Sequence, residues 1–230
     1  MRPWYRFILA LARWILRGIG PMRVIGREHL PRGRNFIMAS NHFSFFEPPI
    51  LGVASHIELH YFAKQKLFEI PVFGRLIRSV NAVPINRGST DLTGLNGALE
   101  VLRAGGSLVI FPEGGRNRTG RLKPPKGGIG YLALGSGVPI VPAYVRNSNR
   151  MLNCTLRRSK ITVAFGPPLE PDPELLNLER KEAHRRIGRA VMDQIALLEQ
   201  QVLALETGTD GATPKADSAP GPGRPGPVHP

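Results

Sequence analysis

A histidine and a glutamate five residues apart are the first candidates for chemistry in this sequence. His42 and Glu47 both lie in the segment SNHFSFFEP, which directly follows a hydrophobic run. A carboxylate at this spacing can orient the imidazole and stabilise its protonated form, so that His42 can act as a general base toward a hydroxyl. A lone histidine is more often structural, but the carboxylate, the flanking Asn41 and Ser44 and the position after a strand favour catalysis.

A segment rich in glycine and arginine is the second candidate. The sequence FPEGGRNRTG at 111–120 again follows a hydrophobic run. Two consecutive glycines, of which Gly114 is the first, let backbone N–H groups approach an anion closely. Arg116 offers a guanidinium group that can bind a phosphate. Glu113 lies between the hydrophobic run and this cationic segment, which argues against an ordinary solvated loop.

The elements expected to position these residues alternate between strands and helices. Strands are predicted at residues 22–27, 35–40, 57–63, 82–86, 107–111, 139–145 and 161–165. Helices are predicted at residues 48–54, 71–79, 91–104, 128–135 and 173–206. The alternation indicates one α/β domain, a single sheet flanked by helices. His42, Glu113 and the pair Arg87 and Gly88 each follow a predicted strand, and ligand sites collect at the carboxyl ends of strands.

The first 20 residues predict an amphipathic helix. Arg2, Arg6, Arg13 and Arg17 fall within one arc of about 60° on a helical wheel. The longest uncharged run is far shorter than the roughly 20 apolar residues that a spanning helix needs. We therefore expect a helix that lies in the membrane interface with its arginines facing anionic headgroups. The alternative is a helix packed on the domain with its arginines in water.

Composition limits the remaining possibilities. Lys and Arg number 31 against 17 Asp and Glu, a net charge of +14 that suits an anionic partner such as a membrane, a phosphorylated substrate or a nucleic acid. Nucleic acid is the least favoured, because no recognition module is visible. A single cysteine, Cys154, excludes an internal disulfide, and no cofactor fingerprint or metal-spaced cluster is present. We expect one folded domain at 21–206 and a disordered tail, rich in Gly and Pro, at 207–230.

Four segments in order resemble the glycerophospholipid acyltransferase family, specifically its bacterial 1-acyl-glycerol-3-phosphate acyltransferases. The segment 41–48 resembles the family's NHxSxxDP block, and 111–116 resembles its FPEG-x-R block. Residues between Ala63 and Gly88 resemble the block that ends in arginine and glycine, and the sequence VPIVPA at 138–143 resembles the last block. Together these blocks extend over roughly residues 22–170.

The resemblance implies that the domain at 21–206 has a glycerophosphate acyltransferase-like fold. It implies transfer of a fatty acyl chain from a thioester, acyl-CoA or acyl-carrier protein, to a lysophospholipid hydroxyl. The expected acceptor is 1-acyl-glycerol-3-phosphate, giving phosphatidic acid at the cytoplasmic face of the cell membrane. No metal or additional cofactor is expected. The family implies that His42, supported by Glu47, deprotonates the hydroxyl. It also implies that the acceptor is held by Lys64, Arg87, Gly88, Glu113, Gly114 and Arg116.

One residue departs from the family pattern, because Glu47 occupies a position where aspartate is usual. The additional methylene moves the carboxylate by about an ångström if the backbone stays in place, and such a displacement can greatly slow an enzyme. Three interpretations follow. The helix after His42 is shifted to compensate, the enzyme acts on another acceptor, or activity is reduced. In the extreme case the chain is a non-catalytic protein that binds anionic lipid.

Overall fold

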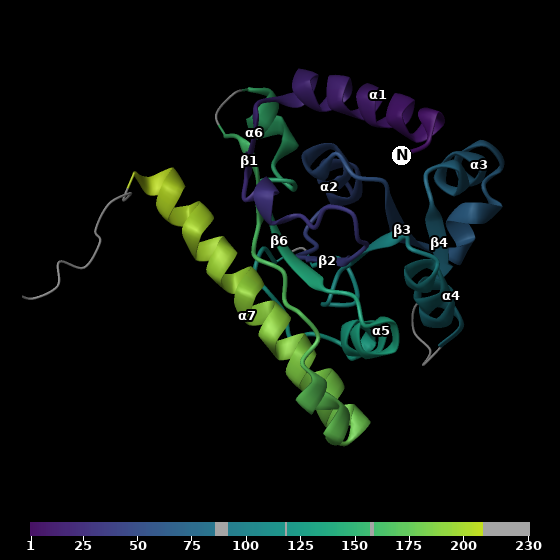
Figure 1. Ribbon diagram of the computed structural model, residues 1–230. Helices are drawn as coiled ribbons and strands as arrows, with labels where there is room; N and C mark the ends of the chain where they lie inside the picture. The colour runs from purple at the N-terminus through teal and green to yellow at the C-terminus, as the bar shows by residue number, and fades with distance from the viewer. Residues whose placement is uncertain (86–91, 118, 157–158, 209–230) are drawn as a thin grey trace, which may run out of the picture.

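A computed structural model describes residues 1–85, 92–117, 119–156 and 159–208 (Figure 1). Within them the strands form one sheet in the order β1-β7-β6-β2-β5-β3-β4. All pairs are parallel except β6 with β7. The predicted α/β class and each predicted strand are confirmed, with ends that differ by a few residues. The strands are β1 (Met22–Ile25), β2 (Ile37–Ser40), β3 (Leu59–Lys64), β4 (Ala82–Ile85), β5 (Ser107–Ile110), β6 (Ile140–Arg146) and β7 (Ile161–Phe165).

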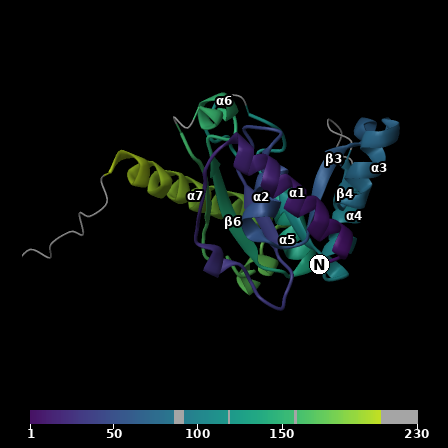
Figure 2. The same ribbon diagram turned by 90° about the horizontal axis from the view of Figure 1, so that it is seen from above.

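Helices cover both faces of this sheet (Figures 1 and 2). One face carries α1 (Pro3–Ile19), α2 (Glu47–Ser55) and α3 (Pro71–Ser79), and the other carries α4 (Leu92–Arg103), α5 (Gly128–Ser136) and α7 (Arg180–Thr207). The helices divide between the two faces because connections between parallel strands are right-handed, so connections that run in opposite directions along the sheet place their helices on opposite faces. The path from β2 through β3 to β4 runs in one direction along the sheet, and the path from β4 through β5 to β6 runs back.

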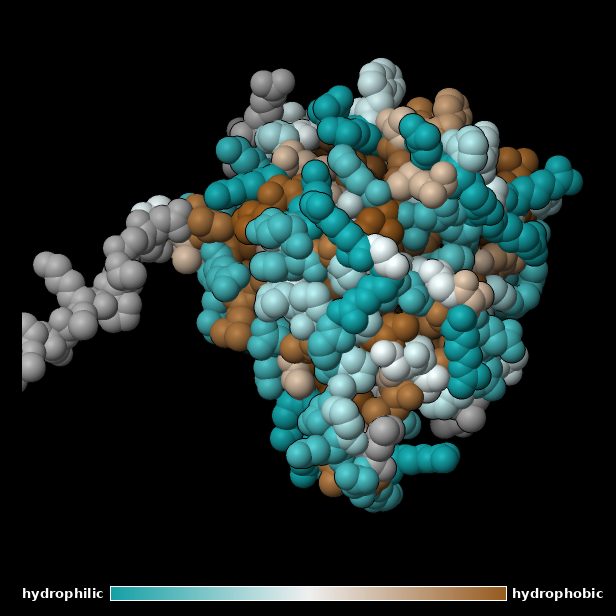
Figure 3. Space-filling view, viewed as in Figure 1, coloured by the Kyte–Doolittle hydropathy of each residue, from teal (hydrophilic) through white to brown (hydrophobic). Residues whose placement is uncertain are grey.

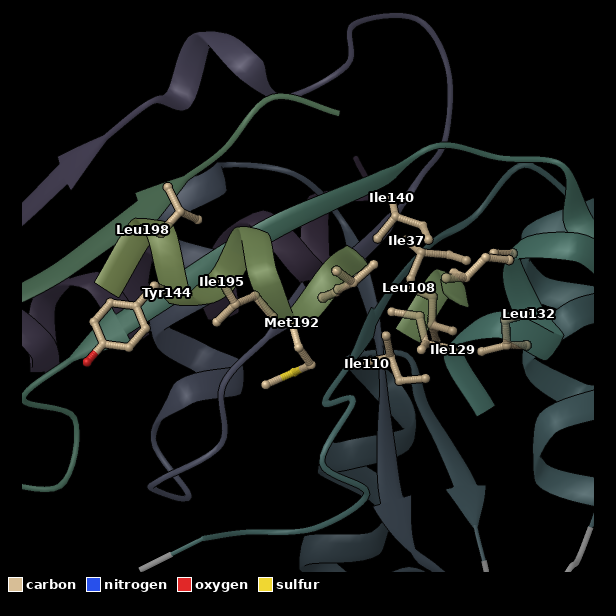
Figure 4. Packing of buried hydrophobic residues seen from close by; sticks show 14 of the residues in the cluster. Ile37, Leu108, Ile110, Ile129, Leu132, Ile140, Tyr144, Met192, Ile195 and Leu198 are labelled. Atoms are coloured by element: carbon tan, nitrogen blue, oxygen red, sulfur yellow. The ribbon is translucent and has the colours of Figure 1, made fainter. Parts of the chain in front are cut away.

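The core has two halves because successive strand residues point to opposite faces. Ile37 and Leu108 pack with α5 and α7, whereas the adjacent Met38 and Val109 pack with α2. Figure 4 shows the first half, in which Ile129, Ile195 and other side chains of α5 and α7 meet the sheet. Both faces are therefore apolar, which explains why these strands are continuous hydrophobic runs in the sequence.

The helix predicted at 173–206 is wrong in its first part. Residues Pro173–Asn177 form a separate 3₁₀ turn, η3, and α7 begins only at Arg180. Asp172 caps the turn by accepting a hydrogen bond from the backbone N–H of Glu174 at 2.9 Å, and Leu178 is extended. A short helix, α6 (Met151–Thr155), and the 3₁₀ turns η1 (Arg27–His29) and η2 (Gln65–Glu69) were not predicted. The tail predicted from 207 lies, beyond residue 208, outside the described residues.

The N-terminal helix is present as α1 and lies over α2. Tyr5 and Leu16 are buried against the domain, and the hydroxyl of Tyr5 accepts a hydrogen bond from the backbone N–H of Leu59 at 3.1 Å. Of the four arginines expected to face lipid, Arg2 pairs with an acidic side chain of the domain. Its Nε donates to Glu58 at 2.6 Å because the start of α1 lies against the amino end of β3. Among the described helices, none is long and apolar enough to cross a membrane.

Candidate active site

The topology of the sheet reverses where β2 and β5 lie side by side. These strands are parallel neighbours, yet β2 leads to α2 on one face and β5 leads to α5 on the other. At such a switch point the two connections separate beyond the carboxyl ends of the strands, which is where α/β proteins place their ligands. His42 follows β2 and Glu113 follows β5, so both sequence candidates lie at this switch point.

His42 and Glu47 form a buried hydrogen-bonded pair. The Nδ1 atom of His42 lies 2.6 Å from Oε2 of Glu47, which is the first residue of α2 and is fully buried. A carboxylate only accepts, so Nδ1 carries the shared proton and Nε2 is the nitrogen with a free lone pair. The geometry therefore suits a base whose tautomer and ring orientation are fixed before a substrate arrives.

The second carboxylate oxygen of Glu47 is held by three donors. Its Oε1 atom accepts from the backbone N–H groups of Phe43 and Ser44 at 2.8 and 3.1 Å and from the Ser148 hydroxyl at 2.7 Å. The start of α2 also favours a negative charge. The loop and the helix start thus fit the longer glutamate side chain. Ser148 could not be found from the sequence, because it lies 101 residues away and approaches only through the pairing of β6 with β2.

Glu113 joins the loop after β5 to the loop that carries His42. One carboxylate oxygen accepts from the backbone N–H of His42 at 3.3 Å, and the other accepts from the side-chain amide of Asn117 at 3.0 Å. The backbone N–H of Asn117 in turn donates to the carbonyl of His42 at 2.6 Å. Burial raises the pKa of Glu113, and the hydrogen bonds from Asn117 and His42 oppose that shift. Sequence reasoning assigned no role to Asn117.

Phe111 fixes the plane of the His42 ring. The two rings stack with centroids 3.9 Å apart and an interplanar angle of 16°. Phe111 is the residue directly after β5, so its place beside His42 also depends on the pairing of β2 with β5. The imidazole is thereby held on one edge by Glu47 and on one face by Phe111.

Arg116 places a cation beside the same loop. Its guanidinium carbon lies 3.5 Å from the ring centroid of Phe45, a cation–π contact that orients the side chain. The preceding turn requires Gly114, which has a φ of 72°. The side chain of Lys126 lies across this glycine, so that a Cβ atom there would come within 2.4 Å of it. The segment therefore places positive charge close to the loop that carries His42.

Of the remaining candidates, Lys64 lies further along the same sheet edge. Lys64 is the exposed last residue of β3, and it pairs with Ile85 at the end of β4. Within the described part of the chain, no hydrogen bond or ion pair joins Lys64 to His42 or Glu113. Arg87 and Gly88 lie outside the described residues.

The chain is similar to known acyltransferases. A family model described as "Acyltransferase" matches residues 21–146, which include His42, Glu47, Glu113 and Arg116. A 1-acyl-sn-glycerol-3-phosphate acyltransferase of Bacillus subtilis is 27% identical over 201 residues, covering 86% of this chain and 98% of the relative. One from Limnanthes douglasii is 32% identical over 168 residues, covering 70% of this chain and 58% of the relative.

A solved structure shows the same likeness in three dimensions. The crystal structure of the 1-acyl-sn-glycerophosphate acyltransferase from Thermotoga maritima matches with a TM-score of 0.63 and 26% identity. The match covers 83% of this chain and 79% of that one. The resemblance inferred from the four sequence blocks is thus confirmed. Since the family model spans more than half of the chain and includes the loops after β2 and β5, this protein belongs to the acyltransferase family and is an acyltransferase enzyme.

Proposed function

We propose that this acyltransferase moves a fatty acyl chain from acyl-CoA or acyl-carrier protein to the free hydroxyl of a lysophospholipid. The proposed acceptor is 1-acyl-glycerol-3-phosphate, and the product is then phosphatidic acid. The proposal rests on the buried pair of His42 and Glu47, whose Nδ1 and Oε2 atoms are 2.6 Å apart, and on the cationic loop of Arg116 beside it. The relatives named for this reaction support the choice of acceptor.

The proposed mechanism needs one base and no covalent enzyme intermediate. Nε2 of His42 takes the hydroxyl proton while the oxygen bonds to the thioester carbonyl carbon. Glu47 stabilises the imidazolium that forms. When the carbon–sulfur bond breaks, the imidazolium returns its proton to the departing thiolate, so the enzyme ends in its starting state. The chain's own residues supply each of these steps, and we propose no metal or cofactor beyond the acyl donor.

The acceptor phosphate is proposed to bind to the cations at the carboxyl edge of the sheet. Arg116 is the principal ligand, and Lys64 and Arg87 are further cations, the latter with the adjacent Gly88. Gly114 shapes the turn that presents Arg116. Glu113, whose oxygens are engaged by His42 and Asn117, is assigned to holding the two loops together, because a carboxylate repels a phosphate.

Replacing Arg116 by alanine is expected to raise the acceptor KM by about 10- to 100-fold, since a charge-assisted hydrogen bond to phosphate is lost. The donor KM and kcat should change little. Arg116→Lys should be intermediate, because lysine keeps the charge without the bidentate fork. Arg103→Ala, at the end of α4, is the matched control. Comparable increases in both KM values would place Arg116 outside the acceptor site. Initial rates at varied acceptor and donor concentrations measure this.

The enzyme is proposed to be peripheral or monotopic at the cytoplasmic face of the cell membrane, through α1. The outward side of this helix exposes Trp4, Phe7, Leu11, Trp14 and Ile15. Aromatic and aliphatic side chains on a helix with arginines beside them are typical of helices that lie in the bilayer interface. Three arginines of α1 are exposed to solvent: Arg6, Arg13 and Arg17.

Changing these three arginines to glutamine is expected to weaken binding to anionic vesicles by on the order of a hundredfold, at about 1 kcal/mol each. Binding to neutral vesicles should not change, and added salt should reduce the difference. A triple replacement of Arg103, Lys181 and Arg189, which lie on the opposite face of the sheet, is the control. Sedimentation with both kinds of vesicle measures the partition. If the two triple variants behaved alike, α1 would not be the membrane contact.

The reaction itself is tested by incubating purified protein with acyl-CoA or acyl-carrier protein and a panel of lysolipids. Thiol release reports on the donor, and mass spectrometry of the lipid identifies the acceptor. Acceptor-dependent thiol release with matching phosphatidic acid supports the proposal. Vesicle binding without thiol release would instead indicate the non-catalytic, anionic-lipid-binding protein considered for Glu47.

A further inference from the structure

Helix α3 turns its apolar side outward. Val72 is 80% exposed, Leu76 is 42% exposed and Phe73 is 43% exposed, and Ile70, just before the helix, is 48% exposed. The single buried residue of the helix is Gly74. A surface helix in a soluble protein shows the reverse arrangement, with its apolar stripe on the core and its polar side in water.

Specific contacts with η2 fix this orientation. A Cβ atom on Gly74 would lie 2.4 Å from the carbonyl oxygen of Phe68, so the helix can approach η2 only through this glycine. On the same side, the guanidinium group of Arg78 lies 5.2 Å from the centroid of the Phe68 ring. The side of α3 that packs on η2 is therefore the side of Gly74, and the exposed Arg78 lies at the border of that side. Rotating Val72 and Leu76 inward would break both contacts.

The outward face of α3 adjoins that of α1. Both helices lie on the same side of the sheet (Figure 1), and the turn that follows α3 reaches the start of α1. Arg2 donates to the side chain of Asn81, and the backbone N–H of Asn81 donates to the carbonyl of Arg78 at 3.1 Å. Hydrophobic and pale residues, interspersed with hydrophilic ones, follow the upper edge of Figure 3 over the two helices.

Exposed apolar side chains are concentrated near these helices. All but two of the large hydrophobic side chains that are exposed in the described residues lie in the N-terminal segment with α1, in the loop after His42, or in and just before α3. The loop contributes Phe45 and Phe46. The two exceptions are Leu156 and Leu197. A concentration of this kind marks a surface that contacts an apolar phase or a partner.

The charges on these helices match an anionic lipid surface. Neither α1 nor α3 contains an aspartate or glutamate, and α3 carries the exposed Arg75 and Arg78 beside its apolar face. Apolar side chains bordered by cations can enter the headgroup region while the cations remain at the level of the phosphates. This continuity of α3 with α1 favours a bilayer over a second protein.

We propose that α3 is a second bilayer-contacting element, whose face of Val72, Phe73 and Leu76 enters the membrane interface beside α1. The inference extends the membrane binding given under the proposed function and names the surface responsible. It also has a consequence for the site. Because α3 follows the carboxyl end of β3 through η2, its insertion brings the edge of the sheet that carries His42 and Lys64 toward the plane in which a lysolipid lies.

A fluorescent label tests insertion directly. Cys154 is fully buried, so a cysteine introduced at Val72 can be labelled selectively with an environment-sensitive dye. Vesicles of phosphatidylglycerol and phosphatidylcholine should shift the emission of the label at Val72→Cys to shorter wavelength. The same label at Leu197→Cys on α7, a site with 48% exposure, should not shift. An unshifted emission at Val72→Cys with bound vesicles would overturn the proposal.

Substitutions on the outward face of α3 test how much this face contributes to vesicle binding. Val72→Asp and Leu76→Asp should each weaken vesicle binding by about tenfold or more, and Val72→Ser by less, whereas Leu197→Asp should leave it unchanged. Unchanged thermal unfolding midpoints show that the variants are folded. If light scattering without vesicles instead shows a dimer that Val72→Asp dissociates, the face is an interface between two copies and the proposal is wrong. Thiol release with a soluble short-chain acceptor tests the chemistry separately from docking.

Discussion

Replacing His42 by alanine is expected to lower the rate of acyl transfer by about 10²–10⁴-fold, the usual contribution of a positioned general base. The acceptor hydroxyl is a weak nucleophile, and the variant has no group to take its proton as the thioester is attacked. Glu47 cannot replace the imidazole, because its side chain is fully buried and its Oε1 atom is held by Phe43, Ser44 and Ser148.

The measurement is thiol release at saturating acceptor and donor, so that a loss of binding is not mistaken for a loss of chemistry. Thermal unfolding shows whether the variant is folded, since His42 is largely buried. A matched control is His56→Asn, because His56 is exposed at the end of α2 and has a φ of 60° that asparagine tolerates. A His42→Ala variant with near-full turnover would contradict the proposed mechanism.

Local patterns in the sequence predicted most of this fold, and the reason is physical. Strands such as 37–40 and 107–110 are buried on both sides, so each run is mostly apolar and stands out from its polar surroundings. His42 and Glu47 were found together because they are only five positions apart in the sequence. Where the interacting groups are close along the chain, their spacing alone indicates the pair.

Contacts between distant segments could not be predicted in this way. Ser148 reaches Glu47, and Phe111 stacks on His42, only because β6 and β5 lie on either side of β2. The amphipathic pattern of 71–79 predicted the helix with its observed ends, yet it could not show that the apolar side faces outward. That orientation depends on the close approach of Gly74 to Phe68, which a helical period does not encode.

Replacing Glu47 by glutamine is expected to be nearly as damaging as removing His42. The loop donors, Phe43, Ser44 and Ser148, require an acceptor at Oε1, so the amide nitrogen of glutamine would face His42. An amide N–H there can only donate to Nδ1, so the imidazole proton moves to Nε2. Nε2 is then protonated and cannot accept the proton of the acceptor hydroxyl. The wrong tautomer and the missing charge both oppose catalysis. Replacing the aspartate of the serine-protease triad by asparagine, a comparable change, lowers kcat by about 10⁴-fold.

Replacing Glu47 by aspartate distinguishes a site built around glutamate from a tolerated lesion. The shorter side chain cannot reach Nδ1 of His42 and the donors to Oε1 at once unless the start of α2 moves, because the present contacts of 2.6 to 3.1 Å use its full length. We therefore expect Glu47→Asp to lower kcat by about 10- to 100-fold, although it restores the family's usual residue. Ser148→Ala removes one donor to Oε1 and leaves the contact with His42, so it should lower kcat by less than Glu47→Asp does. Steady-state kcat values for the three proteins decide the matter, and an aspartate variant as fast as the natural enzyme would mean that the loop accommodates either acid.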